Sequence, residues 1–250
     1  MDTWHRRGTR FCFDRNRMPL STAAPLATSS INIAATPSET VLFGAPLFSK
    51  KSLLPGNDVP YAGAEKVAVD HLARAMLKAA ILGSERAGTL RIELRKSKAL
   101  FGLLTKTSLV LIGMESERGW PAGSLEAALN AALRGREAAA DAWLYAHLRQ
   151  DSASPDGAIL DEVRAGLAGR YALDRAQTKT LGFVTGVSWT LTVAGERMRG
   201  AAQPQEIQAL FAACEHERPE IWRALDTAIL GAIGRRRESR PDTNTDFSSD

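Results

Sequence analysis

The chain has 250 residues, 44% of them hydrophobic and 24% charged, and these shares are typical of a globular protein rather than a disordered or fibrous one. No apolar run approaches the roughly 18–20 residues that cross a bilayer, so a transmembrane protein is not expected. Two cysteines are too few for a disulfide scaffold or a cysteine-based zinc site. A formal net charge of +4 leaves anionic partners open without requiring one.

The two ends of the chain differ in composition from its middle. Residues 1–40 are first rich in arginine and then in Pro, Ser, Thr and Ala, without an apolar signal core, which predicts a disordered leader. Residues 238–250 are polar and predict a disordered tail. We therefore expect one globular domain over 41–237. Its first part, 41–62, is broken by Gly and Pro and predicts a loop with one short strand.

The first periodic segment is a helix over about 64–82, and Gly83 is its expected end. Apolar and polar residues then alternate over 90–94 and again over 108–112. This alternation predicts two paired strands with a long connection, 96–107, between them.

Helical periodicity returns over 125–133 and 140–148, and a third helix is expected to start with Asp156 as its N-cap. A second strand pair follows, beginning near Tyr171 and ending with the alternating run 187–193. Two helices over 207–214 and 221–229 close the domain, and Arg235, Arg236 and Arg237 are expected to cap the last of them.

The order of a helix followed by a hairpin thus occurs twice, which is the pattern of a winged helix. We predict a mostly helical α+β protein with two winged-helix-like helix–hairpin units on one helical body.

Enzyme signatures are missing from the sequence. It contains neither a P-loop nor a GxGxxG motif, and Ser188 lies within an alternating strand rather than at a nucleophile elbow. The segment from His216 to Glu220 lacks the second His of a zinc motif. We therefore assign no catalytic residue, metal or cofactor. An active site assembled from dispersed residues such as His147 and Asp174 stays open, although no motif points to it.

The connection of the first hairpin is unusual because it combines apolar residues with flanking cations. Hairpin tips are normally polar. Lysines are attracted to anionic headgroups by about 1 kcal/mol each, and large apolar side chains gain about 1.5–3 kcal/mol each when fully buried. The tip therefore predicts a reversible membrane anchor, with three alternatives: it folds back on the core, it forms an oligomer contact, or it is a wing that contacts DNA phosphates. The residues concerned are Lys96, Lys98 and Lys106 for headgroups and Leu100, Phe101, Leu103 and Leu104 for insertion.

The order of motifs from 64 to 193 resembles the Golgi phosphoprotein 3-like adaptors, a family that binds phosphoinositides on membranes. After a helix, these motifs are 88–93 (GTLRIE), a basic and apolar hairpin, 123–129 (GSLEAAL), a helix with Ala142-Trp143-Leu144, and a helix with Val163-Arg164. The resemblance implies that Arg74 and Arg164 hold the lipid phosphate and that a hairpin dips into the bilayer. Unlike the family pattern, no Trp precedes Arg74 in its helix.

From these observations we predict a non-enzymatic cytoplasmic protein that attaches reversibly to anionic membranes or phosphorylated lipids. The alternative is a winged-helix regulator that binds nucleic acid. Acidic residues at the start of the helix from Asp156, including Asp161 and Glu162, argue against that alternative because they repel phosphates.

Overall fold

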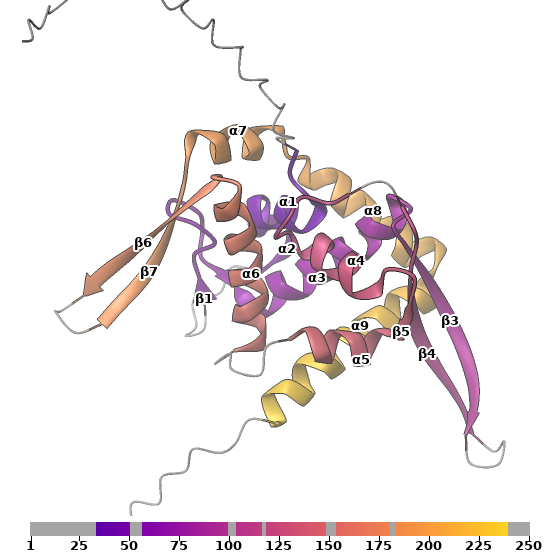
Figure 1. The fold of residues 1–250 in the computed structure, drawn as a ribbon. Coiled ribbons are helices and arrows are strands. Elements are labelled where there is room, and N and C mark those ends of the chain that lie inside the picture. Colours follow the sequence, from indigo (N-terminus) through magenta and orange to yellow (C-terminus); the bar gives the residue numbers. More distant parts are fainter. Residues whose placement is uncertain are drawn as a thin grey trace, which may run out of the picture. The chain divides into compact units, whose positions relative to one another are not determined.

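The computed structural model describes residues 34–50, 57–99, 104–116, 119–148, 154–180 and 184–239, which belong to one compact unit. The fold is α+β and mostly helical, as the sequence predicts (Figure 1). The described helices are α1 (Pro37–Phe43), α2 (Ala45–Phe48), α3 (Val69–Arg86), α4 (Leu125–Leu133), α5 (Ala140–His147), α6 (Pro155–Gly169), α7 (Val193–Ala201), α8 (Pro204–Glu217) and α9 (Pro219–Glu238). The described strands are β1 (Asn57–Asp58), β2 (Val67–Ala68), β3 (Leu90–Ala99), β4 (Leu104–Gly113), β5 (Glu137–Ala139), β6 (Leu173–Thr180) and β7 (Val184–Leu191).

The strands form small antiparallel sheets at the margins of the helices. β1 pairs with β2, β3–β4–β5 make a three-stranded sheet, and β6 pairs with β7. The predicted order of a helix followed by a hairpin therefore occurs twice, as α3 with β3–β4 and as α6 with β6–β7.

Helix α3 forms the centre of the core. Its residues 72–77 and 79–84 are buried except for half-buried Arg74, so apolar side chains point outward around the helix rather than along one stripe. A helix that is apolar on most sides must be enclosed by other elements. Here α1, α4, α6, α8, α9 and β3 all pack on α3 (Figure 1).

The prediction of a leader ending at residue 40 is wrong, because α1 begins at Pro37 and is part of the core. Thr36 caps this helix in a capping box with Glu39, and the Glu39 carboxylate accepts the Thr36 backbone N–H at 2.8 Å. Val41 and Leu42 are fully buried. The expected loop over 41–62 is likewise replaced in part by α1 and α2.

Gly83 does not end α3, which continues to Arg86. A Cβ at position 83 would lie 2.4 Å from Cγ of Pro37. The glycine is therefore required for the close approach of α1 to α3 rather than for a helix stop. This distinction depends on a contact between residues 46 positions apart, which helix-end rules do not consider.

The long connection predicted in the first hairpin is also corrected. The ladder continues from Leu90↔Gly113 to Ala99↔Leu104, so most of the segment 96–107 is paired strand. Only residues 100–103 connect the two strands, and they lie outside the described residues. In Figure 1 the hairpin extends away from the helices toward its tip.

The second hairpin matches its prediction closely, but its second strand ends at Leu191 and α7 begins at Val193. The Thr192 hydroxyl accepts the Gly195 backbone N–H at 3.0 Å and so caps α7. Helix α7 was not predicted.

The three arginines near the end of α9 contact residues of other helices, so their role goes beyond the predicted capping of α9. Arg236 lies 3.8 Å from the ring centre of Tyr145, and its Nε donates to the Tyr145 carbonyl at 2.8 Å. Arg235 donates to Asp141, and Arg237 pairs with Asp156. Asp156 is thus a buried partner for α9, and the N-cap predicted there is Ser154 instead.

Two buried carboxylates, Glu126 and Glu39, link α1 to α4 and to the end of α6. Glu126 accepts the backbone N–H of Ser38 at 2.7 Å and the Ser38 hydroxyl at 3.0 Å. Glu39, also fully buried, pairs with Arg170 at the end of α6. Burial raises the pKa of Glu126 to about 7; the Ser38 N–H opposes this shift and the charge of Glu39 adds to it.

We predict that the free energy of unfolding falls as pH rises from 5 to 8. The pKa of Glu126 is about 7 when folded and 4.5 as the reference value, so the folded state holds an extra proton between these values. The stabilisation is complete below the lower value and is lost as pH rises through the upper one, a total of roughly 3 kcal/mol. Urea unfolding of wild type and Glu126→Gln checks this, because the neutral amide removes the dependence. An equal pH slope in both proteins would contradict it.

Candidate functional site

On one face of the β3–β4 hairpin, the side chains of β3 become more exposed along the strand. Leu90 and Ile92 are buried against the helices, Leu94 is half-buried, and Lys96 is exposed on the same side of the alternation. Of the predicted membrane-inserting residues, Leu100, Phe101 and Leu103 lie outside the described residues. The side chains of Lys98, Leu104 and Lys106 lie outside them as well.

The opposite face of this hairpin is fixed by ion pairs. Arg95 donates to both carboxylate oxygens of Glu137 in β5, at 2.6 and 2.8 Å, and also to Glu93. The hydrogen bonds from Arg95 lower the pKa of Glu137. A bidentate pair defines geometry as well as charge, so β5 supports the hairpin on this side.

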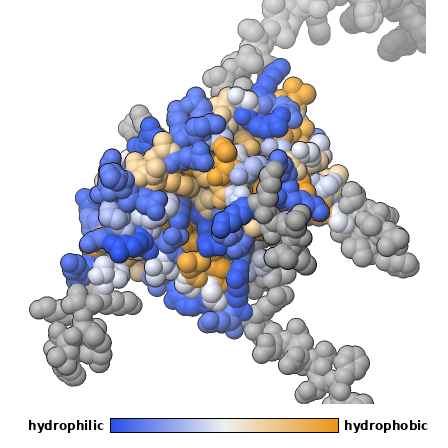
Figure 2. Space-filling view, turned by 180° about the vertical axis from the view of Figure 1, so that it is seen from behind, coloured by the Kyte–Doolittle hydropathy of each residue, from blue (hydrophilic) through white to orange (hydrophobic). Residues whose placement is uncertain are grey.

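A groove of about 970 Å³ lies on the other face, between the hairpin and α9. Its apolar lining includes half-buried Leu94 and buried Leu109 and Ala228. Exposed Lys96, Arg223 and Arg235 lie at its polar edges. Figure 2 shows apolar surface bordered by hydrophilic side chains on the face seen from behind.

A second pocket, of about 510 Å³, contains Arg74, one of the two arginines expected to hold phosphate. Its walls come from α2, α3, α8 and α9 and include His71, Lys78 and Trp222. Lys78 lies 3.8 Å from a ring centre of Trp222 and 2.7 Å from Asp226. The pocket thus combines cations with aromatic and acidic neighbours.

Two of the three guanidinium nitrogens of Arg74 already donate hydrogen bonds within its own helix. Its Nε donates to the Asp70 carbonyl at 3.0 Å and its Nη2 to the Asp70 carboxylate at 2.7 Å. This is the surface helix pair that sequence spacing also allows. The side chain is 25% exposed, and Nη1 has no partner among the described residues, so this nitrogen can reach a ligand in the pocket.

Arg164 has a different setting from the one that the resemblance implies. Its side chain is 5% exposed, and its Nε donates to the Pro60 carbonyl at 3.0 Å. Nη2 donates to the Val59 carbonyl and to Asp58, and Nη1 donates to Asp161. Arg164 fastens the segment 58–60 to α6, and a role in headgroup binding conflicts with this burial.

The expected arginine pair is therefore not brought together. Arg74 opens into the pocket toward α8 and α9, whose lining does not include Arg164. Neither residue lines the groove beside the hairpin. The groove residues on α9 were not predicted, although Ala224, Ala228 and Gly231 recur at helical spacing and mark a stripe with little side-chain bulk.

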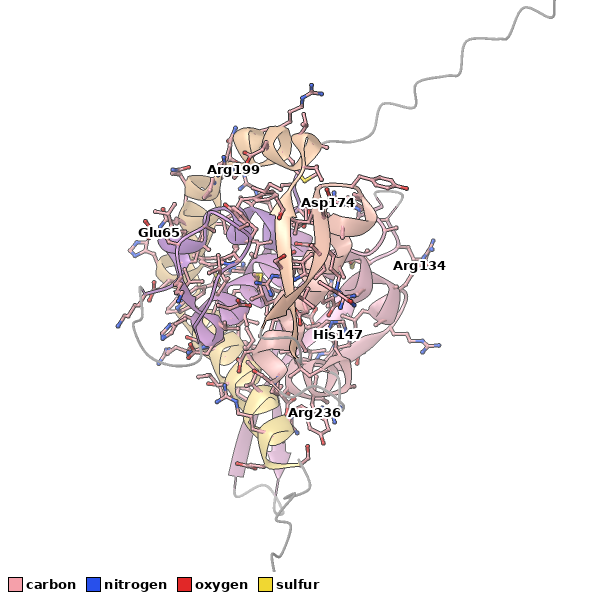
Figure 3. All side chains as sticks on the ribbon, turned by 90° about the vertical axis from the view of Figure 1, so that its left-hand side faces the viewer. Glu65, Arg134, His147, Asp174, Arg199 and Arg236 are labelled. Atoms are coloured by element: carbon pink, nitrogen blue, oxygen red, sulfur yellow. The ribbon has the colours of Figure 1, made fainter. Side chains whose placement is uncertain are left out.

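His147 and Asp174, the dispersed candidates for catalysis, lie apart on α5 and β6 (Figure 3). His147 instead bonds Glu162 at 3.0 Å and stacks on Trp143, with ring centres 5.1 Å apart. These contacts make His147 a hydrogen-bonded residue at the edge of the core. Within the described ranges, no three His, Cys, Asp or Glu side chains are placed to hold a metal.

We predict that Arg164→Ala lowers the free energy of unfolding by about 2–4 kcal/mol, because it leaves the buried carbonyl of Pro60 and the half-buried carbonyl of Val59 without their donor. Urea unfolding measures this, with Arg197→Ala on exposed α7 as the matched control. If the wild type binds lipid vesicles, the folded fraction of Arg164→Ala is expected to bind them equally. If Arg164→Ala lost vesicle binding without losing stability, the predicted role of Arg164 in headgroup binding would be supported instead.

Comparison of the chain with protein-family models, with curated proteins and with solved structures found no match in any of the three. The similarity to the Golgi phosphoprotein 3-like adaptors therefore stays a prediction from the motifs. In the part of the chain that the structure describes, no helix is both long and apolar enough to cross a bilayer.

Proposed function

We propose that this protein attaches reversibly to anionic membrane surfaces through the β3–β4 hairpin. The observation that carries the proposal is the length of the ladder: ten residues of β3 pair with ten of β4, and a four-residue connection joins them. By sequence, that connection is Leu-Phe-Gly-Leu. The ladder supports a short, apolar end on a stiff two-stranded arm.

The energetics of such an arm suit reversible attachment. Its lysines, at positions 96, 98 and 106, are worth about 1 kcal/mol each near an anionic surface. Each bulky tip side chain that enters the acyl boundary adds about 1.5–3 kcal/mol. Cationic attraction and shallow apolar burial act together in peripheral membrane proteins, which bind without spanning the bilayer.

The pocket around Arg74 supports a preference for phosphorylated headgroups. Arg74 and Lys78 both line it, paired with Asp70 and Asp226, and His71 is a further nitrogen donor in the lining. Arg74 can offer a phosphate a charged donor at Nη1, which has no partner among the described residues. Glu215 and Asp226 also line the pocket, so selectivity depends on Arg74 reaching the phosphate rather than on net charge.

The winged-helix interpretation, with nucleic acid as partner, is less well supported. It would make the hairpins wings and the start of α6 a recognition element. That start carries Asp156, whose carboxylate is buried and paired with Arg237. A DNA-binding helix needs donors for phosphates and base edges at this position, so we favour the membrane proposal.

We predict that Phe101→Asp combined with Leu104→Asp abolishes co-sedimentation with anionic vesicles. Each change removes about 1.5–3 kcal/mol of apolar burial and adds repulsion from the surface, which amounts to about tenfold or more in affinity per side chain. The matched control, Ala209→Asp with Ala213→Asp, adds the same charge to exposed positions of α8. Equal binding by all three proteins would remove the hairpin as anchor, and tight salt-sensitive binding to duplex DNA instead would favour the nucleic-acid alternative.

We also predict that Arg74→Ala weakens the preference for vesicles with a phosphorylated inositol headgroup over phosphatidylserine vesicles of equal charge by about tenfold. The fold should tolerate the change, since a partly exposed helix pair contributes little stability. Arg86→Ala, at the exposed end of the same helix, is the control. Unchanged selectivity in quantitative vesicle binding would exclude the pocket as a headgroup site.

A further inference from the structure

The groove between the hairpin and α9 is separate from the Arg74 pocket and has a lining of its own. α9 contributes residues to both, with Trp222 and Asp226 facing the pocket and Arg223 and Thr227 facing the groove. The groove volume, about 970 Å³, is at the upper end of the range of small-molecule sites. Its second wall is the hairpin face that carries Leu94 and Lys96.

The space in the groove comes from small side chains on α9. Ala224, Ala228 and Gly231 recur along one face of the helix and oppose Leu94 and Leu109. A Cβ added at Gly231 would meet no atom within 4 Å. Small residues on one wall and leucines on the other leave an apolar floor, which suits a hydrocarbon chain better than a polar solute.

The charges at the edges favour an anionic group. Asp141 is neutralised by Arg235, which donates to its carbonyl at 2.8 Å and to its carboxylate at 3.3 Å. Lys96 and Arg223 are exposed, and no carboxylate of the described residues forms an ion pair with either. Glu220 is the remaining acidic residue in the lining, so the two cations exceed it by one charge.

We infer that this groove binds one anionic phospholipid, with an acyl chain along the apolar floor and the phosphate at Lys96 and Arg223. The inference rests on the proposed attachment, because the hairpin brings the groove to the membrane. Lys96 lies four residues before the tip, a distance of about 13 Å along a strand. When the tip enters a membrane, a lipid in the leaflet that faces the protein is therefore within reach of the groove.

The test separates groove binding from vesicle binding by using a lipid without a bilayer. Dihexanoyl phosphatidic acid is titrated as monomers into the full chain and followed by calorimetry. Gly231→Leu fills the groove without a steric clash and is expected to weaken binding by about tenfold or more. Gly234→Leu is the matched control: it lies on the same helix, a Cβ there also meets nothing within 4 Å, and it does not line the groove.

Headgroup and chain are tested in separate arms. Lys96→Glu should weaken binding of the phosphatidic acid, and dihexanoyl phosphatidylcholine and inorganic phosphate should each bind about tenfold more weakly than it does. The inference is overturned if Gly231→Leu and Gly234→Leu bind the phosphatidic acid with equal affinity. It is also overturned if the wild type binds inorganic phosphate as tightly as the phosphatidic acid. The variant with Phe101→Asp and Leu104→Asp should keep monomer binding, so a failure of the anchor and a failure of the groove give different results.

Discussion

The burial of α3 is the constraint on which the rest of the structure depends. Leu72, Met76, Leu77 and Ile81 lie on different sides of this helix, and all are almost fully buried. A single neighbour cannot cover such a helix, so elements from both ends of the chain must pack around it. The first is α1, which precedes α3 by 25 residues, and the last is α9. The two hairpins then follow α3 and α6 at the periphery of this helical body, where their ends are free of the core (Figure 1).

Arginine holds much of this arrangement together through contacts that cross between elements. Arg164 fastens 58–60 to α6, Arg170 pairs with buried Glu39, and Arg236 lies on Tyr145. The guanidinium group suits these positions because one planar fork serves several carbonyl and carboxylate acceptors at once. A positive formal charge in the sequence is therefore a poor guide to the surface, since several of its arginines are used inside the fold. Cations that remain exposed, such as Lys96 and Arg223, are available to an anionic ligand.

The features with functional potential surround α9 and the first hairpin. One face of α9 contributes Trp222 and Asp226 to the Arg74 pocket, and another contributes Arg223 and Ala228 to the groove. The groove continues onto the hairpin that we propose as the anchor. The opposite face of the hairpin is tied to β5 through Arg95 and Glu137, so the arm is supported on that side. An anchor on a supported arm places neighbouring binding surfaces at a defined height above a membrane, which is the physical link between the two proposals.

The sequence by itself determined the elements whose signals are local. Periodicity located α4 and α5 almost to the residue, and the alternation over 187–193 located most of β7, which runs from Val184 to Leu191. Each pattern reports a face turned toward a core. What only the tertiary structure decided were the contacts between distant residues. By sequence, Gly83 is predicted to end a helix, whereas in the structure it allows Pro37 to pack closely. Arg164 is predicted to be a surface cation, whereas in the structure it is buried beneath residues 58–60. The groove belongs to the same class, since its two main walls, the β3–β4 hairpin and α9, are more than 100 positions apart in the chain. Spacing rules extend over a few residues, whereas these features arise when the chain folds back on itself.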